Sequence, residues 1–204
     1  MYQPFYHTDQ YRPQLTPPSY WHATTARPTL APGSGEHTVD VAIIGGGYCG
    51  LSAALHLARD HGASVALLEA GDIGWGASGR NAGFNTLPAT KHDYIGLQRA
   101  LGEAGAAGFM AAQQEALQLV ASLAAAEGIA TQACGEGSYV VAHSPAAWAG
   151  LQDEHHAWQR HTPVASRLLT RAEFAGCGHA GDAQYGALHI LHGGGLNPLA
   201  LASG

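Results

Sequence analysis

The sequence has 204 residues, of which 46% are hydrophobic and 12% are charged, and its formal net charge is -6. A chain of this length can bury one sizeable core. The acidic balance argues against a nucleic acid as the main partner, because binding phosphates requires a basic face.

Nothing in the sequence indicates a targeting or membrane segment. Residues 1–7 lack the basic and apolar regions of a signal peptide, and no apolar run approaches the ~18 residues of a membrane helix. The cysteines, Cys49, Cys134 and Cys177, are spaced too widely for a disulfide framework or a zinc site, which favours a reducing compartment. We therefore expect a cytoplasmic protein without a membrane partner.

The first 37 residues are rich in proline and show neither helix nor strand periodicity, so we predict an extended arm. For residues 1–15 a disordered tail is an equal alternative. Tyr20 and Trp21 are adjacent large aromatic residues that are costly to leave in water. We expect this pair to pack on the body of the protein.

Residues 39–69 have the order of a βαβ unit. The almost wholly apolar residues 39–44 predict a buried strand, and a helix with one apolar face follows Gly50 and ends at Gly62. Residues 64–68 predict a second buried strand, which ends at Glu69. The glycines at 45, 47 and 50 have the GxGxxG spacing, which places phosphates at the helix N-terminus, while Glu69 accepts hydrogen bonds from a ribose. A dinucleotide site is thus predicted; the alternative is a structural glycine turn with Glu69 as a surface acid.

The sequence patterns of the remaining elements are weaker. Residues 109–127 predict a helix stopped by Gly128, and Pro145 begins a helix that runs to about residue 160. Thr170 and Glu173 form a capping-box pattern, and Asn197 with Pro198 predicts the start of another helix. Because that helix has only about two turns before Gly204, we expect the sequence to be the N-terminal part of a longer protein. Strands are predicted for residues 129–131, 138–141 and 185–191, and a loop for residues 193–198.

A second glycine-rich segment, residues 74–83, decides between dinucleotides. Its pattern, with Gly74, Gly76, Ala77, Ser78, Asn81 and Gly83, resembles the second glycine loop of the D-amino-acid-oxidase-like family of FAD-dependent oxidoreductases. Together with Tyr20-Trp21 it is most similar to the γ-glutamylputrescine oxidase-like branch. Ala82 is a mild departure, because many relatives have glycine there.

The resemblance implies an FAD cofactor, a small-molecule amine substrate and transfer of a hydride from the carbon beside nitrogen. It also implies a set of cofactor-binding residues: Gly45, Gly46, Gly47, Tyr48, Cys49, Gly50, Glu69, Gly76, Ala77, Ser78, Arg80, Asn81 and Gly83. The alternative for Arg80 is a surface charge at the rim of the loop. No catalytic residue is assigned, because the family's substrate groups lie mostly in a C-terminal half beyond Gly204.

Several alternatives remain open. An NAD-dependent dehydrogenase would share the βαβ unit, and a non-catalytic remnant would bind an adenine nucleotide or nothing. The thirteen histidines show no trusted metal-ligand spacing, so no metal is expected, although His189 or His192 could face the flavin. Covalent flavin attachment through Cys134 or Cys177 is conceivable but lacks a motif.

We accordingly predict an α/β fold with a Rossmann-like FAD-binding βαβ domain and an interleaved α+β substrate domain. The arm comprises residues 1–37, and the FAD-binding core comprises residues 38–95. Residues 96–192 belong in part to the substrate domain, and residues 193–204 begin a helix on the flavin side.

Overall fold

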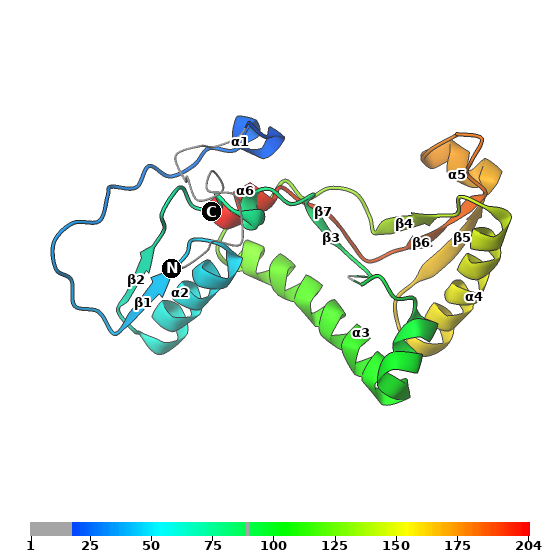
Figure 1. Ribbon diagram of the computed structural model, residues 1–204, viewed down its shortest axis with the longest axis horizontal. Helices are drawn as coiled ribbons and strands as arrows, with labels where there is room; N and C mark the ends of the chain where they lie inside the picture. Colours follow the sequence, from blue (N-terminus) through cyan, green and yellow to red (C-terminus); the bar gives the residue numbers. More distant parts are fainter. Residues whose placement is uncertain (1–17, 89) are drawn as a thin grey trace, which may run out of the picture. The chain divides into compact units, whose positions relative to one another are not determined.

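The computed structural model describes residues 18–88 and 90–204, which form two compact units (Figure 1). Unit 1 comprises Met1–Gly83, Glu127–Gln132 and Leu196–Gly204. Unit 2 comprises Phe84–Ala126 and Ala133–Gly195. The chain therefore leaves unit 1 and returns to it twice. Residues 1–17 lie outside the described residues, and they include residues 1–15, for which a disordered tail was one expectation.

Unit 1 contains the predicted βαβ unit. Strand β1 (Val41–Ile44) pairs in parallel with β2 (Val65–Leu68), and helix α2 (Tyr48–His61) connects them. The helix ends because Gly62 adopts a left-handed conformation (φ 64°) that closes the last turn with backbone hydrogen bonds. The element order deduced from the sequence is confirmed for this segment.

The expectation that both strands are buried is wrong. No residue of β1 or β2 is buried, and Ile44 and Leu68 are 89% and 54% exposed. A parallel strand becomes buried only when layers cover both faces of its sheet. Helix α2 packs on the two strands, and within the described residues no second layer covers their other face (Figure 1).

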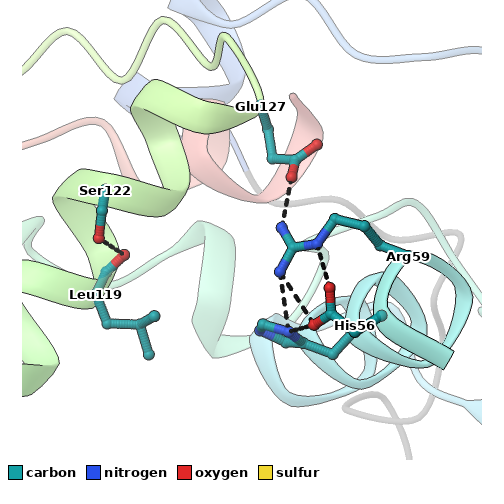
Figure 2. A network of polar contacts seen from close by, with 6 residues as sticks. His56, Arg59, Leu119, Ser122 and Glu127 are labelled. Atoms are coloured by element: carbon teal, nitrogen blue, oxygen red, sulfur yellow. Dashed lines mark hydrogen bonds and ion pairs between the residues drawn. The ribbon is translucent and has the colours of Figure 1, made fainter.

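Charged residues fasten the C-terminal half of α2 to the second segment of unit 1 (Figure 2). The Arg59 Nη1 donates to Glu127 Oε1 at 2.8 Å, and its Nε donates to Asp60 Oδ1 at 2.7 Å. His56 lies on the same Asp60 carboxylate at 2.8 Å. Hydrogen bonds from Arg59 and His56 hold the pKa of Asp60 well below its usual range. Because these groups are exposed, solvent screens the network and its contribution to stability is small.

Two short helices complete unit 1. Helix α1 (Tyr20–Thr24) interrupts the arm that the sequence predicted to be extended, because Ser19 caps its first turn by accepting from His22 N. Helix α6 (Pro198–Ser203) begins at the predicted Asn197 cap with proline at its first position. A single 3-10 turn, η2 (Ala77–Gly79), lies in the second glycine-rich loop.

Unit 2 is built on a three-stranded antiparallel sheet. Strand β6 (Gly186–Ile190) lies between β4 (Ser138–Val141) and β5 (Ser166–Thr170), and every residue of β6 is buried. Helix α4 (Pro145–His161) packs against β5 and β6, as Figure 1 shows, and α5 (Arg171–Cys177) begins with the predicted capping box. The α4, α5, β4 and β6 predictions are confirmed.

The longest helix, α3 (Tyr94–Ala126), begins well before the predicted start at residue 109. Glycines cost about 1 kcal/mol each against alanine in a helix, but Leu97, Ala106 and Met110 are buried in the core of unit 2 and their burial offsets that cost. Gly102 is non-helical (φ 72°), so the helix consists of two segments. None of the helices in residues 18–88 and 90–204 has both the length and the apolar character needed to cross a bilayer.

The glycine-rich stretch before α6 is partly a strand rather than the predicted loop. Strand β7 (Gly193–Gly195) pairs antiparallel with β3 (Phe84–Thr86), which the sequence did not indicate. The predicted strand at residues 129–131 is absent from the ladders of the described chain. The backbone oxygen of Thr131 instead accepts from the N–H of Asn197, so this segment contacts the cap of α6 and not a neighbouring strand.

A half-buried carboxylate in unit 2 predicts a pH dependence of stability. Both oxygens of Glu154 lie 3.0 Å from the N–H of Tyr94, and Oε1 also accepts from Trp158 Nε1 at 2.6 Å. Burial raises the pKa of Glu154 despite these hydrogen bonds. With a raised folded-state pKa, the favourable contribution is complete below the unfolded value, about 4.3, and declines as pH rises through the folded value.

We therefore expect Glu154→Gln to flatten the fall in the free energy of unfolding as pH rises above about 4. Urea unfolding at a series of pH values measures this slope. The matched control is Glu115→Gln on the exposed surface of α3, which should keep the wild-type slope. Equal slopes in wild type and Glu154→Gln would refute the prediction.

Candidate functional site

The turn between β1 and α2 requires glycine at both of its ends. Gly45 has φ 109°, which side chains rarely adopt. A Cβ on Gly50 would lie 2.0 Å from the backbone oxygen of Gly45 and 3.3 Å from Ile43 Cγ2. The first turn of α2 therefore lies directly against the end of β1. This close approach is what the third glycine of a dinucleotide fingerprint provides.

Glu69 shapes this turn through its carboxylate. Its Oε2 accepts from the N–H of Gly46 at 2.6 Å, and its Oε1 accepts from the N–H of Gly71 at 2.8 Å. Both interactions fix the carboxylate at the end of β2. Each oxygen retains a further lone pair, so hydroxyl donors can still be accepted there.

The N-terminus of α2 supplies the donors of the site. The N–H groups of a first helical turn have no partner within the helix, and the helix dipole favours an anion there. One of them, from Tyr48, donates to Ser78 Oγ at 3.0 Å. This hydrogen bond joins the first glycine turn to the second glycine-rich loop, which brings two predicted segments into one site.

Asn81 holds the second glycine-rich loop in shape. Its Nδ2 donates to the oxygens of Ala77 (3.2 Å) and Ser78 (3.1 Å), and its Oδ1 accepts from Gly83 N at 2.8 Å. The side chain thereby satisfies backbone groups on both sides of the loop. Asn81 is exposed itself, so its contribution is to the loop backbone.

Arg80 is a cation with unsatisfied donors. Its guanidinium carbon lies 4.3 Å from the centroid of the Trp75 ring, which fixes its plane. Its Nε and Nη2 are buried and have no hydrogen-bond partner. Burying part of a charge without a partner is costly, so this arrangement fits an anionic group. The alternative, a surface charge at the rim, does not fit two buried nitrogen atoms.

Helix α6 packs against the second glycine-rich loop. The Leu199 side chain packs so closely that a Cβ on Gly74 or Gly79 would lie within 3.0 Å of its Cδ1. The Tyr48 hydroxyl donates to the Pro198 oxygen at 2.9 Å, and burial raises the pKa of this phenol, which keeps it a donor. This role of Leu199 could not be predicted from the sequence, because an apolar residue in a short helix carries no signal beyond burial.

Asn197 connects three segments of unit 1 and is 1% exposed. Its Oδ1 caps α6 by accepting from Leu199 N and Ala200 N. Its Nδ2 donates to Thr25 Oγ1 at 2.8 Å and to Gln132 Oε1 at 2.9 Å. The Asn-Pro pair signalled the cap, but nothing in the sequence pointed to Thr25 or Gln132.

The residues predicted to hold the cofactor all lie in unit 1 between Gly45 and Gly83. Gly46 and Gly83 are buried, while Cys49, Gly76 and Ala77 are exposed. The three cysteines are free thiols.

Other candidate groups are engaged structurally. His189 is buried in unit 2, where its Nε2 lies 2.8 Å from the Glu136 oxygen and its Nδ1 accepts from Arg167 Nε at 3.3 Å. It has no free ring nitrogen to offer a flavin. Residues 18–88 and 90–204 contain no group of three or more His, Cys, Asp or Glu side chains that could hold a metal.

Unit 2 also contains a cavity of about 480 Å³ between the loop after β3, the sheet and α4. Leu87, Leu188 and Trp158 make much of its wall apolar. The acid at its edge, Glu154, is already engaged with the first turn of α3.

The fold and the site define a class of protein. A parallel βαβ unit, with a glycine turn at the helix N-terminus and an acid ending the second strand, is the arrangement of dinucleotide-binding proteins. The model of the DAO family, described as FAD dependent oxidoreductase, matches residues 40–204. The chain belongs to this family of FAD-dependent oxidoreductases, and its cofactor is FAD.

Two curated relatives support this assignment. The chain is 34% identical over 171 residues to the gamma-glutamylputrescine oxidoreductase of Escherichia coli (strain K12), covering 82% of this chain and 38% of that protein. It is 48% identical over 71 residues to the probable oxidoreductase OrdL of Rhizobium meliloti (strain 1021), covering 34% of this chain and 16% of the relative. These matches confirm the predicted resemblance, including that to the γ-glutamylputrescine oxidase-like branch.

Solved structures show the same fold. The glycine oxidase of Geobacillus kaustophilus matches with a TM-score of 0.58 and 25% identity, over 82% of this chain and 43% of that one. The L-amino acid deaminase of Proteus myxofaciens, in complex with anthranilate, matches in fold with a TM-score of 0.60 at 20% identity, over 88% of this chain and 38% of that one. The chain thus spans about two fifths of the length of these proteins.

Proposed function

We propose that this chain holds FAD in an enzyme that oxidises the C–N bond of an amine or amino acid. The family assignment supports the cofactor. The printed names of the relatives, a gamma-glutamylputrescine oxidoreductase and a glycine oxidase, support a substrate with an amino group.

The first glycine turn and Glu69 would hold the adenosine half of FAD. Gly45 and Gly46 shape the turn, because their N–H groups donate to Leu68 and Glu69, and Gly47 and Gly50, with the first turn of α2, would present N–H groups to the diphosphate. Glu69 would accept the ribose hydroxyls with the lone pairs that Gly46 and Gly71 leave free. A carboxylate at this position also disfavours a ribose that carries a 2′-phosphate.

The observation that carries the proposal is the unpaired guanidinium of Arg80. Two of its nitrogen atoms are buried without partners, in a loop that a hydrogen bond from Tyr48 N to Ser78 joins to the glycine turn. A diphosphate would supply the missing acceptors with charge-assisted hydrogen bonds. Arg80 lies in the second glycine-rich loop, and a βαβ unit can bind a dinucleotide without such a loop. The cation therefore favours FAD over NAD.

FAD bound here would supply a two-electron acceptor for the hydride on the carbon beside the amine, which would leave an imine for water to hydrolyse, with oxygen or another acceptor taking the electrons in turn. The described residues of this chain contribute binding and orientation. Arg80 and the α2 N-terminus neutralise the diphosphate, and Glu69 fixes the ribose. None of the described side chains is assigned a proton transfer.

A spectroscopic titration tests the proposal. We expect the purified protein to bind FAD with a perturbed flavin absorbance, and the absorbance to bleach anaerobically with one member of a panel of diamines, γ-glutamylated diamines and amino acids. Tight NADH binding without FAD binding would favour a dehydrogenase and refute the cofactor assignment. FAD binding without bleaching by any amine would refute the substrate class.

A further inference from the structure

The part of the arm that follows residue 18 is fastened to the second glycine-rich loop. The indole Nε1 of Trp21 on α1 donates to the backbone oxygen of Asn81 at 2.9 Å. Trp21 is half-buried, whereas its neighbour Tyr20 is 71% exposed. The expectation that both aromatics pack on the protein is therefore met by Trp21 and wrong for Tyr20.

Two further contacts fasten the same segment. Arg27 forms an ion pair with Asp72, which lies just before the second loop. Thr25 Oγ1 accepts from the buried Nδ2 of Asn197. The arm thus contacts the second loop near both ends of that loop. It also contacts Asn197, the cap of helix α6, which packs against the loop. Three separate contacts therefore join the arm to the second loop and to α6, which is more than a simple chain connection requires.

The indole contact acts on the residue that organises the loop. The Asn81 side chain spans the loop through hydrogen bonds to Ala77, Ser78 and Gly83. Trp21 fixes the peptide carbonyl of that same residue. The neighbouring residue is Arg80, whose guanidinium has the unsatisfied donors. Holding the Asn81 peptide therefore fixes the backbone from which the Arg80 side chain projects.

We propose that Trp21, Thr25 and Arg27 clamp the cofactor-binding loop and that Trp21 is the positioning residue, whose indole N–H holds the loop in the shape that retains FAD. This inference rests on the proposed function. Trp21 acts through Asn81 and Arg80 and touches no cofactor atom in this assignment. A preorganised loop binds more tightly because it loses less freedom on binding.

The charges around the clamp agree with an arm that belongs to this site. Burial, followed by the positive charges of Arg27 and Arg80, lowers the pKa of His22, while Asp72 opposes this shift. His22 Nδ1 lies 2.8 Å from Ser19 Oγ on its own helix. A lowered pKa favours the neutral form of His22, which adds little repulsion to Arg80.

The test compares two adjacent aromatic residues of α1. Trp21→Phe keeps an aromatic ring but removes the N–H donor, and Tyr20→Phe removes a hydroxyl from the exposed neighbour. FAD dissociation constants are measured by flavin fluorescence titration well below the melting temperature, so that only folded protein is compared. We expect Trp21→Phe to weaken FAD binding about fivefold, as the loss of one hydrogen bond predicts, and Tyr20→Phe to leave it unchanged.

A second variant keeps the test decisive if Trp21→Phe does not fold. Arg27→Gln removes the exposed ion pair with Asp72 and should weaken FAD binding about twofold at low salt and less at high salt. An unchanged dissociation constant in Trp21→Phe, or in Arg27→Gln where the first variant is unfolded, would overturn the clamp and leave the proposed function intact. Equal losses in Trp21→Phe and Tyr20→Phe would overturn the role of the indole. A wild-type protein that does not bind FAD would overturn both proposals.

Discussion

Replacing Gly50 with alanine should raise the FAD dissociation constant by about a hundredfold. The new Cβ would lie 2.0 Å from the Gly45 oxygen, which is a backbone atom of the same tight turn and cannot rotate away as a side chain would. Alanine gains about 1 kcal/mol in helix propensity over glycine, but forced overlap in a packed region costs up to about 3 kcal/mol or more. The cost of the overlap exceeds the gain in helix propensity, so α2 must move away from β1. The N–H groups of its first turn then no longer point at the diphosphate.

Fluorescence titration with FAD and thermal unfolding measure this effect together. The matched control is Gly108→Ala on α3, where a Cβ meets nothing within 4 Å. That variant should gain about 1 kcal/mol in stability from helix propensity and keep the wild-type FAD affinity. Tight FAD binding by Gly50→Ala would show that the turn tolerates a side chain, contrary to the geometry described here.

Asn197→Ala should lower the free energy of unfolding by about 4 kcal/mol. The change removes the cap of α6, which is worth about 1 kcal/mol. It also removes the Nδ2 hydrogen bonds to Thr25 and Gln132, at about 1 kcal/mol each, and leaves the buried N–H of Leu199 without a partner, which adds about 1 kcal/mol or more for an unsatisfied buried group. The side chain is 1% exposed, so water cannot readily replace it.

Two comparisons separate these contributions in urea unfolding. Asn197→Asp keeps both cap hydrogen bonds to Leu199 and Ala200 but loses the Nδ2 donor, so its loss should be intermediate. Ser144→Ala removes only a cap, at α4, where Ser144 Oγ accepts from Ala147 N at 3.1 Å, and should cost about 1 kcal/mol. A loss in Asn197→Ala no larger than that in Ser144→Ala would contradict the network around Asn197.

The features that the sequence predicted are those set by local chemistry. The turn from Gly45 to Gly50, the α6 cap at Asn197 and the capping box at Thr170 each depend on a few neighbouring residues, and the structure has all three. A pattern of this kind is decided before distant segments meet.

The errors arise where distant segments decide. The glycines of β7 carry no strand propensity, and only their pairing with β3 makes them a strand. The start of α3 is fixed by burial in unit 2 against the local preference of its glycines. Residues 39–44 are apolar enough for a buried strand, yet burial also requires a second covering layer, which no local pattern reports.

The candidate site divides in the same way. Glu69 and Ser78 could be found from spacing and resemblance, and both take part in the contacts that join the turn and the loop. Trp21, Leu199 and the partners of Asn197 come from segments far away in the chain. Such contacts leave no periodic trace in a single sequence, so only the fold can identify them.

The assembly of unit 1 from three separate segments has a consequence for how the protein forms during synthesis. Residues 196–204 carry the Asn197 cap and the helix that supports the second glycine-rich loop, and all of unit 2 lies before them in the chain. Chains are made from the N-terminus, and domains tend to fold as they emerge. The glycine turn must therefore wait until the whole of unit 2 has been made before its last support arrives. Closing so long a loop slows folding more than it lowers stability, so the second glycine-rich loop lacks its packing against α6 throughout that interval.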